Sequence, residues 1–165
     1  MQPLDPDEVR GSFLNSTRGE VRRMALPRDL AETAWGDLDF LGWIDPGAPE
    51  RAYLVLPADP APRGVALRAA TGRSGKLRSA ICQFCVTAHA VSDITLFSAA
   101  LAGPLGRQGN VVGTYLCADL ACSLYVRGKR RPQVPQPGET LSVEERVQRL
   151  VDNVRRFVDR VAAPA

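Results

Sequence analysis

The most regular pattern of apolar positions lies near the C-terminal end of the chain, where hydrophobic side chains recur at alternating spacings of four and three. These positions are Val143, Val147, Leu150, Val154, Phe157 and Val161. That spacing puts them on one face of a helix, and the capping box of Ser142 and Glu145 marks its start. The sequence therefore predicts an amphipathic helix over residues 142–162.

The apolar stripe of this helix spans fewer than three heptads, which favours a packed helix over a long coiled coil. We interpret it as packing on its own domain. Self-association and docking of a partner are the alternatives, because residues 131–141 are rich in proline and are predicted to form a semi-rigid linker before the helix.

Short apolar runs in the middle of the chain are typical of strands. Residues 51–56 and 64–69 are rich in Tyr, Val and Leu and are separated by prolines. Residues 94–99 and 111–116 flank a glycine-rich stretch, which predicts a hairpin. We expect these segments to form a small antiparallel sheet.

The first 26 residues carry two helix-start signals, because Asp5 and Thr17 each stand three residues before a glutamate. Two short helices are predicted there, the second ending before Pro27. Three aromatic residues between positions 35 and 43 are expected to fill a core rather than form an exposed patch. The predicted fold class is α+β, with a domain over residues 1–130 that includes a zinc finger over about 76–130.

Composition places the chain among ordinary soluble proteins. Of its 165 residues, 24% are charged and 45% are hydrophobic, as in a globular domain. The sequence has no stretch approaching the roughly 18 apolar residues of a membrane span. Its first residues are acidic, unlike a signal peptide. We therefore expect a cytoplasmic protein that does not bind a membrane.

The formal net charge of +3 is concentrated in the cysteine-bearing segment. Residues 82–131 contain 5 basic and 2 acidic side chains, whereas basic and acidic residues balance in the rest of the chain. Four thiolates around one Zn²⁺ would add a charge of −2 to this segment. The net charge is therefore weak support for nucleic-acid binding.

The candidate chemistry lies in four cysteines arranged as two pairs. Cys82 and Cys85 are separated by two residues, and Cys117 and Cys122 by four. Each pair can supply two thiolates to one ion, the first from a tight turn and the second around a helix start. With the predicted hairpin between them, the pairs predict a treble clef that holds one structural Zn²⁺.

Other uses of these residues are possible on the sequence alone. Cys82 and Cys85 could form a redox pair, and four cysteines could also hold an iron–sulfur cluster. His89 could replace a cysteine ligand or donate a hydrogen bond to a thiolate. Asp93 and Asp119 flank the cysteine pairs, but we interpret Asp119 as an early-helix residue that complements the helix dipole. The sequence has no other constellation typical of an active site, so we expect no enzyme.

Several segments besides the cysteine spacing follow the pattern of one protein family. Residues 82–89 read Cys-Gln-Phe-Cys-Val-Thr-Ala-His, and residues 112–127 read Val-Gly-Thr-Tyr-Leu-Cys-Ala-Asp-Leu-Ala-Cys-Ser-Leu-Tyr-Val-Arg. Residues 15–20, 38–43 and 93–99 follow it as well. Together they resemble the elongation factor G-binding, fusidic-acid-resistance type zinc-finger domain, from near the N-terminus to about residue 128.

The resemblance implies a treble-clef zinc finger joined to an α+β body, with the four cysteines as zinc ligands. It implies a protein without enzymatic activity that binds elongation factor G and promotes its release from the ribosome. Resistance to fusidic acid would then follow from binding alone. The proline-rich linker and the helix over 142–162 lie beyond the part that resembles the family.

A partner surface is expected on the hairpin and helix of the zinc module. Its candidate anchors are Phe97, Arg107, Tyr125 and Arg127, with packing inside the module as the alternative for the two aromatic residues. The other candidate functions are ribosomal or other RNA binding through Arg127 and the basic residues 129–131, and a dimeric scaffold.

Overall fold

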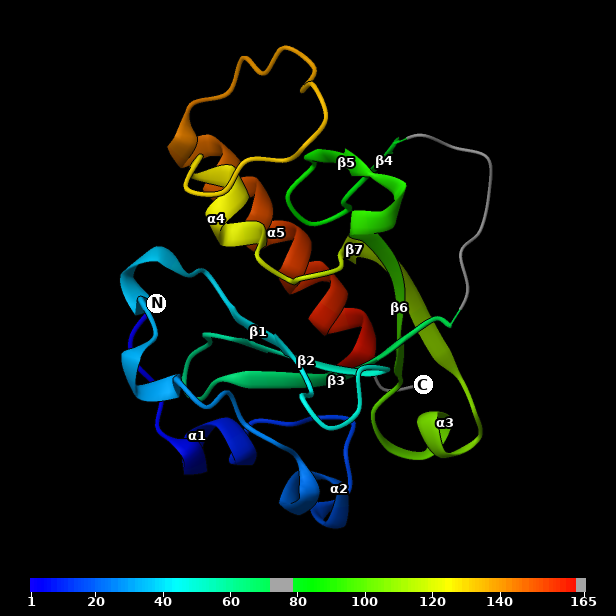
Figure 1. Cartoon of the computed structure of the whole chain (residues 1–165). Coiled ribbons are helices and arrows are strands. Elements are labelled where there is room, and N and C mark those ends of the chain that lie inside the picture. Colours follow the sequence, from blue (N-terminus) through cyan, green and yellow to red (C-terminus); the bar gives the residue numbers. More distant parts are fainter. Residues whose placement is uncertain (72–78, 163–165) are drawn as a thin grey trace.

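A computed structural model describes residues 1–71 and 79–162 (Figure 1). In this part of the chain five strands form one antiparallel sheet in the order β1-β2-β3-β6-β7. The strands are β1 (Leu41–Ile44), β2 (Arg51–Leu56), β3 (Arg63–Ala69), β6 (Ile94–Ala100) and β7 (Val111–Cys117). A second, two-stranded sheet pairs β4 (Ser79–Ile81) with β5 (Ala88–Ala90).

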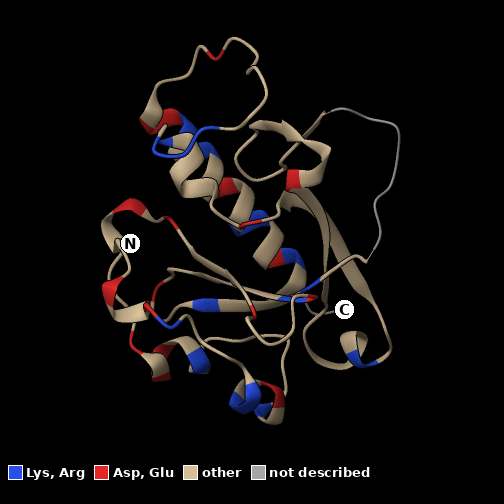
Figure 2. Ribbon diagram, in the orientation of Figure 1, with Lys and Arg blue, Asp and Glu red and all other residues tan. Residues whose placement is uncertain are grey.

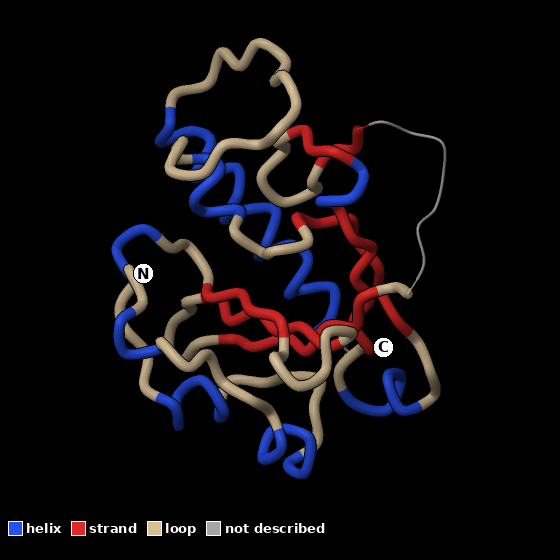
Figure 3. The backbone as a smooth tube through the Cα atoms, in the orientation of Figure 1, coloured by secondary structure: helices blue, strands red, loops and turns tan. Residues whose placement is uncertain are grey.

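Helices lie on both faces of the larger sheet (Figures 1 and 3). They are α1 (Pro6–Gly11), α2 (Arg18–Arg23), α3 (Gly103–Arg107), α4 (Cys122–Val126) and α5 (Val143–Ala162), with 3-10 turns η1 (Leu30–Glu32), η2 (Trp35–Asp37) and η3 (Val91–Asp93). The N-terminal helices cover one face and α5 covers the other, which confirms the predicted α+β class. None of the described helices combines the length and the hydropathy needed to cross a bilayer.

The four predicted strands are present with nearly the predicted bounds. The hairpin over β6 and β7 is in register from Ile94 opposite Cys117 to Ala100 opposite Val111. The structure also differs from the expectation, because the glycine-rich tip contains the short helix α3 and the strands β1, β4 and β5 were not predicted. Only four residues long, β1 contains Gly42, and such a segment gives little strand signal.

Asn15 joins the two halves of the large sheet. Strands β3 and β6 pair over only two residues each and then separate. The Asn15 amide lies between them: its Nδ2 donates to the carbonyl oxygens of Ala66 and Ala100 at 3.0 Å, and its Oδ1 accepts from the Ala66 N–H at 2.8 Å. The side chain thus replaces the missing ladder hydrogen bonds.

The N-terminal layer forms as the capping signals predicted. Asp5 and Thr17 each cap a helix through a complete capping box. Trp35, Phe40 and Trp43 are 8%, 2% and 7% exposed, so the interpretation of these aromatic residues as core is confirmed.

Helix α5 packs on the opposite face of the sheet as part of the main core. Its cap forms through hydrogen bonds between Ser142 and Glu145. Its fully buried side chains are Leu150, Val154, Phe157, Val158 and Val161, which share one core cluster with the four cysteines. The interpretation that the stripe packs on its own domain is confirmed for Leu150, Val154, Phe157 and Val161, whereas Val143 at the start of the helix is 38% exposed.

The predicted linker also contacts the body of the protein. Gln136 forms two hydrogen bonds with the backbone of Ala88 in β5, one donated by its Nε2 at 2.8 Å and one accepted by its Oε1 at 3.0 Å. Residues 131–141 therefore connect α4 to a helix that belongs to the same core.

Candidate metal centre

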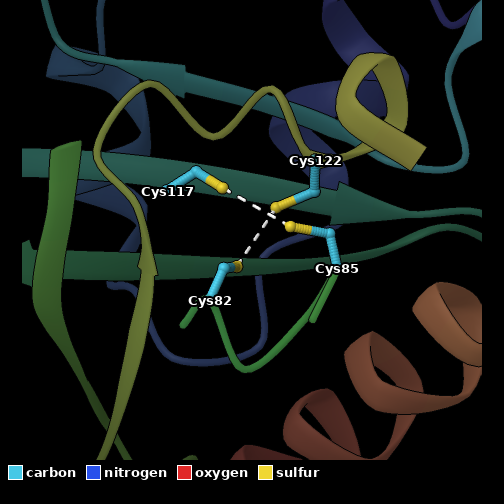
Figure 4. Close-up of side chains that lie close together, drawn as sticks. All are labelled: Cys82, Cys85, Cys117 and Cys122. Carbon is cyan, nitrogen blue, oxygen red and sulfur yellow. Dashed lines mark hydrogen bonds between the residues drawn. The ribbon is translucent and has the colours of Figure 1, made fainter. Parts of the chain in front are cut away.

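The four cysteines come from two segments of the chain whose side chains point toward one another (Figure 4). Cys82 and Cys85 lie in the turn between β4 and β5, Cys117 is the last residue of β7, and Cys122 is the first residue of α4. The second pair therefore lies around a helix start, as predicted.

The backbone of the first turn is strained where it leaves the cysteines. Val86 has a φ of 58°, a conformation that β-branched residues rarely adopt and that costs on the order of 1–3 kcal/mol. Its N–H donates to the carbonyl oxygen of Cys82 at 2.9 Å, which closes the turn. The strained turn aims both sulfur atoms of the pair at the same point.

The sulfur positions fit one tetrahedral ion. All four cysteines are buried, and their sulfur atoms lie within 4.8 Å of one another. The Sγ atoms of Cys82 and Cys122 are 3.7 Å apart, and those of Cys85 and Cys117 are 3.6 Å apart. In a tetrahedral shell with zinc–sulfur bonds of about 2.3 Å, neighbouring sulfur atoms lie about 3.8 Å apart.

These distances also bear on the redox alternative. The shortest sulfur contacts join one pair to the other, and all four cysteines are free thiols. A dithiol couple of Cys82 and Cys85 would leave the other pair without a role. The arrangement matches a single ion bound by two clips.

Electrostatics in the cluster favours a cation at its centre. Hydrogen bonds from Cys117 and the other two thiols lower the pKa of Cys85, because they stabilise a thiolate at that position. The hydrogen bond with Cys117, followed by those with the remaining cysteines, raises the pKa of Cys122. The protonated thiols thus stabilise one thiolate, at Cys85. The same contacts make it harder for Cys122 to lose its proton as well. A divalent cation removes this opposition by compensating the charge.

His89 lies beside the cluster without completing it. Its side chain is 1% exposed, and its Nε2 is 3.3 Å from the Cys117 Sγ. A thiolate can only accept a hydrogen bond, so Nε2 is the donor when Cys117 is ionised. The ring packs edge-on against Tyr125, with centroids 4.6 Å apart. Of the two roles considered for His89, the geometry favours the hydrogen-bond donor.

Replacing His89 with alanine is expected to weaken zinc binding by about 10- to 100-fold, because Cys117 loses the donor that orients and stabilises its thiolate. Competition with a chromophoric chelator measures this affinity. The exchange Val111→Ala, at a 60% exposed position on the far end of β7, is the control and should leave zinc affinity unchanged. Equal affinities of the His89 and control variants would show that the hydrogen bond is irrelevant to the metal.

Asp119 supports the cluster from outside, but its place differs from the expectation. Helix α4 begins at Cys122, so Asp119 precedes the helix. Its carboxylate accepts hydrogen bonds from the Ala121 N–H, the Tyr125 hydroxyl and Arg130, at 3.0, 2.8 and 2.8 Å. Burial and this carboxylate raise the pKa of Tyr125. The hydrogen bonds of Asp119 thus connect the loop between Cys117 and Cys122 to α4.

The four predicted partner anchors do not form one surface. Phe97 is 1% exposed and lies in the main core, so its interpretation as a surface anchor is wrong. Tyr125 packs on His89, and Arg127 binds the carboxylate of Asp39. Arg107 is exposed but lies in α3, at the opposite end of the hairpin from Cys117.

The basic run after α4 is largely neutralised within the chain. Arg127, Lys129 and Arg130 form ion pairs with Asp39, Asp37 and Asp119, respectively. The Asp39 backbone N–H also donates to the Ser123 hydroxyl oxygen at 2.9 Å. These contacts tie the turn before β1 to α4, a structural role for acidic residues that sequence reasoning missed because their partners are far away in the chain.

Comparison with known proteins places this arrangement in a family. A family model described as the FBP C-terminal treble-clef zinc-finger matches residues 8–161. The match includes α5, which the sequence analysis had left outside the family resemblance. Neither the curated proteins nor the solved structures contain a significant match. Because the family model covers nearly the whole chain and the four-cysteine cluster has the geometry of a zinc site, the chain belongs to the FBP C-terminal treble-clef zinc-finger family.

Proposed function

We propose that this chain is a non-enzymatic binding protein that recognises elongation factor G and promotes its release from the ribosome. Cys82, Cys85, Cys117 and Cys122 hold its structural zinc ion. The observation that carries the proposal is family membership over residues 8–161. A shell of four thiolates is typical of a structural site, because it has no open position for water or substrate.

A binding protein of this kind works by unequal affinity. It shifts the factor away from the ribosome only if it contacts the released form better than the bound form. The zinc then acts on function indirectly, by fixing the shape of the contact surface.

The exposed apolar side chains of the zinc module are the proposed contact surface. Ile81 on β4, Val86 in the cysteine turn and Tyr115 on β7 are 54%, 42% and 44% exposed. Gln83 joins the turn to the edge of β7: its N–H donates to the Tyr115 carbonyl oxygen, and its Oε1 accepts from the Tyr115 N–H. An exposed tyrosine held by a rigid turn is a typical interface anchor.

The test is the affinity of the full chain for purified elongation factor G, measured by calorimetry. Tyr115→Ala is expected to weaken binding by about tenfold or more with unchanged zinc content, since aromatic anchors dominate interfaces. Val111→Ala is the matched control, because it alters an exposed residue at the opposite end of the same strand from Cys117. Absence of binding by the unmodified chain would refute the proposed function, and equal affinities of the two variants would refute the surface.

A further inference from the structure

A second exposed feature lies on the face of the sheet opposite α5. Arg51 on β2 stands directly opposite Arg68 on β3, and both side chains are exposed. Like charges in directly opposed positions destabilise a sheet unless something compensates them. The other strand beside β3 places Ser98, not an acid, opposite Arg68. The strands beside Arg68 therefore place no acidic residue directly opposite it.

Helix α2 adds further positive charge next to this pair (Figure 2). We define the arginine cluster as Arg18, Arg22, Arg23, Arg51 and Arg68. The three helical members are exposed. Glu20 on α2 lines the same hollow as Arg51 and Arg68, which places the helix beside the strand pair.

Two members of the arginine cluster line a hollow of about 160 Å³ between α2 and the sheet. Arg51 and Arg68 both line this hollow, together with Asn15, Ser16 and Glu20. The Asn15 amide is already used in the sheet, and Glu20 is held by Thr17 in the helix cap. Arg51 and Arg68 therefore contribute two positive charges to the lining of the hollow, and Glu20 contributes one negative charge.

Some cations of the described chain pair with distant acids, whereas the arginine cluster, like Arg28 and Arg107, has no such pair within the described residues. Arg63, Arg127, Lys129, Arg130 and Arg149 each form an ion pair with an acid ten or more residues away. Within the described residues, the ion pair recorded for the cluster joins Arg51 to its sequence neighbour Glu50 at 3.8 Å. The exposed arginine side chains of the cluster can therefore bind an anion of another molecule.

We propose that the arginine cluster binds backbone phosphates of single-stranded RNA, with one phosphate in the hollow between Arg51 and Arg68. The arginine fork can donate two hydrogen bonds to one phosphate, as it can to a carboxylate. The cationic positions extend from the sheet onto α2, so they can meet successive phosphates of one strand. This site is on the face away from α5 and is separate from the basic run at 127–131.

The test is fluorescence anisotropy of a labelled oligouridine with the zinc-loaded full chain at low and moderate salt. The double variant R51Q/R68Q is expected to lose about tenfold in affinity, and the slope of log affinity against log salt should fall by about 0.7, because the two arginines share one phosphate contact. The matched control K129Q/R130Q removes the same charge from cations that are already paired, and its affinity should stay within about twofold of the unmodified chain.

A third variant is expected to raise the RNA affinity instead of lowering it. Glu20→Gln keeps the capping box but removes the negative charge from the hollow, so RNA affinity should rise by about two- to threefold. No rise in that variant, an equal loss in the two double variants, or no binding of oligouridine would each overturn the proposal. Competition by inorganic phosphate or polyglutamate at the same charge concentration as the RNA would also overturn it, since the site would then be a discrete phosphate or acidic-protein site.

Discussion

Removal of zinc is expected to unfold the half of the protein that contains the cysteines and to abolish its cooperative thermal transition. All four cysteines belong to the same core cluster as Phe84 and the buried face of α5. Structural zinc contributes about 10–16 kcal/mol in zinc-finger peptides, which equals or exceeds the roughly 5–15 kcal/mol of a whole domain. Loss of the zinc ion should therefore remove enough free energy to unfold this core.

Circular dichroism during heating, before and after a tight chelator, measures this effect. Addition of one equivalent of zinc should restore the transition, and the variant Cys85→Ser should behave like the chelated protein because it loses one of four ligands. An unchanged melting temperature, with metal analysis showing that the zinc had been removed, would contradict a bracing role for the ion.

Truncation of Phe157 to alanine is expected to cost about 3–5 kcal/mol in the free energy of unfolding. The side chain is 1% exposed, and its ring lies 5.6 Å from the ring of Phe84 in the cysteine turn. Beside it, the Asn153 Nδ2 donates to the Phe84 carbonyl oxygen at 2.9 Å. A cavity at Phe157 would therefore loosen the contact between α5 and the zinc module.

Urea unfolding measures this loss, and the melting temperature should fall by about 10 °C in a chain of this size. Val143→Ala on the same helix is the control, because Val143 is 38% exposed and its truncation should cost less than about 1 kcal/mol. A similar stability of the two variants would mean that α5 is not part of the main core.

Local chemistry explains which features the sequence could predict. The cysteine spacings predict the site because a clip is formed by a turn of a few residues. The caps at Asp5, Thr17 and Ser142 form as predicted because a capping box needs only residues three positions apart. The stripe on α5 likewise predicts four of its buried side chains, Leu150, Val154, Phe157 and Val161, but it includes the exposed Val143 and omits the buried Val158.

Features that depend on distant contacts could not be predicted in the same way. Gly42 interrupts the strand signal of β1, and the structure supplies the reason: a Cβ at this position would lie 2.9 Å from the Cβ of Leu120 in the second cysteine loop. Arg127 forms an ion pair with Asp39, which lies 88 positions away in the sequence. The sequence does not reveal this partner, so Arg127 was predicted to be an exposed anchor. Phe97 was misinterpreted for a different reason, because its position on a strand leaves open which face of the sheet is covered.

The most direct test of the zinc centre is X-ray absorption at the zinc edge of the purified chain, combined with metal analysis. One zinc per chain surrounded by four sulfur atoms at about 2.3 Å is the predicted result. A shell containing nitrogen or oxygen at about 2.0–2.2 Å would contradict it, because His89 or water would then be a ligand and the site would not be a closed brace of four thiolates.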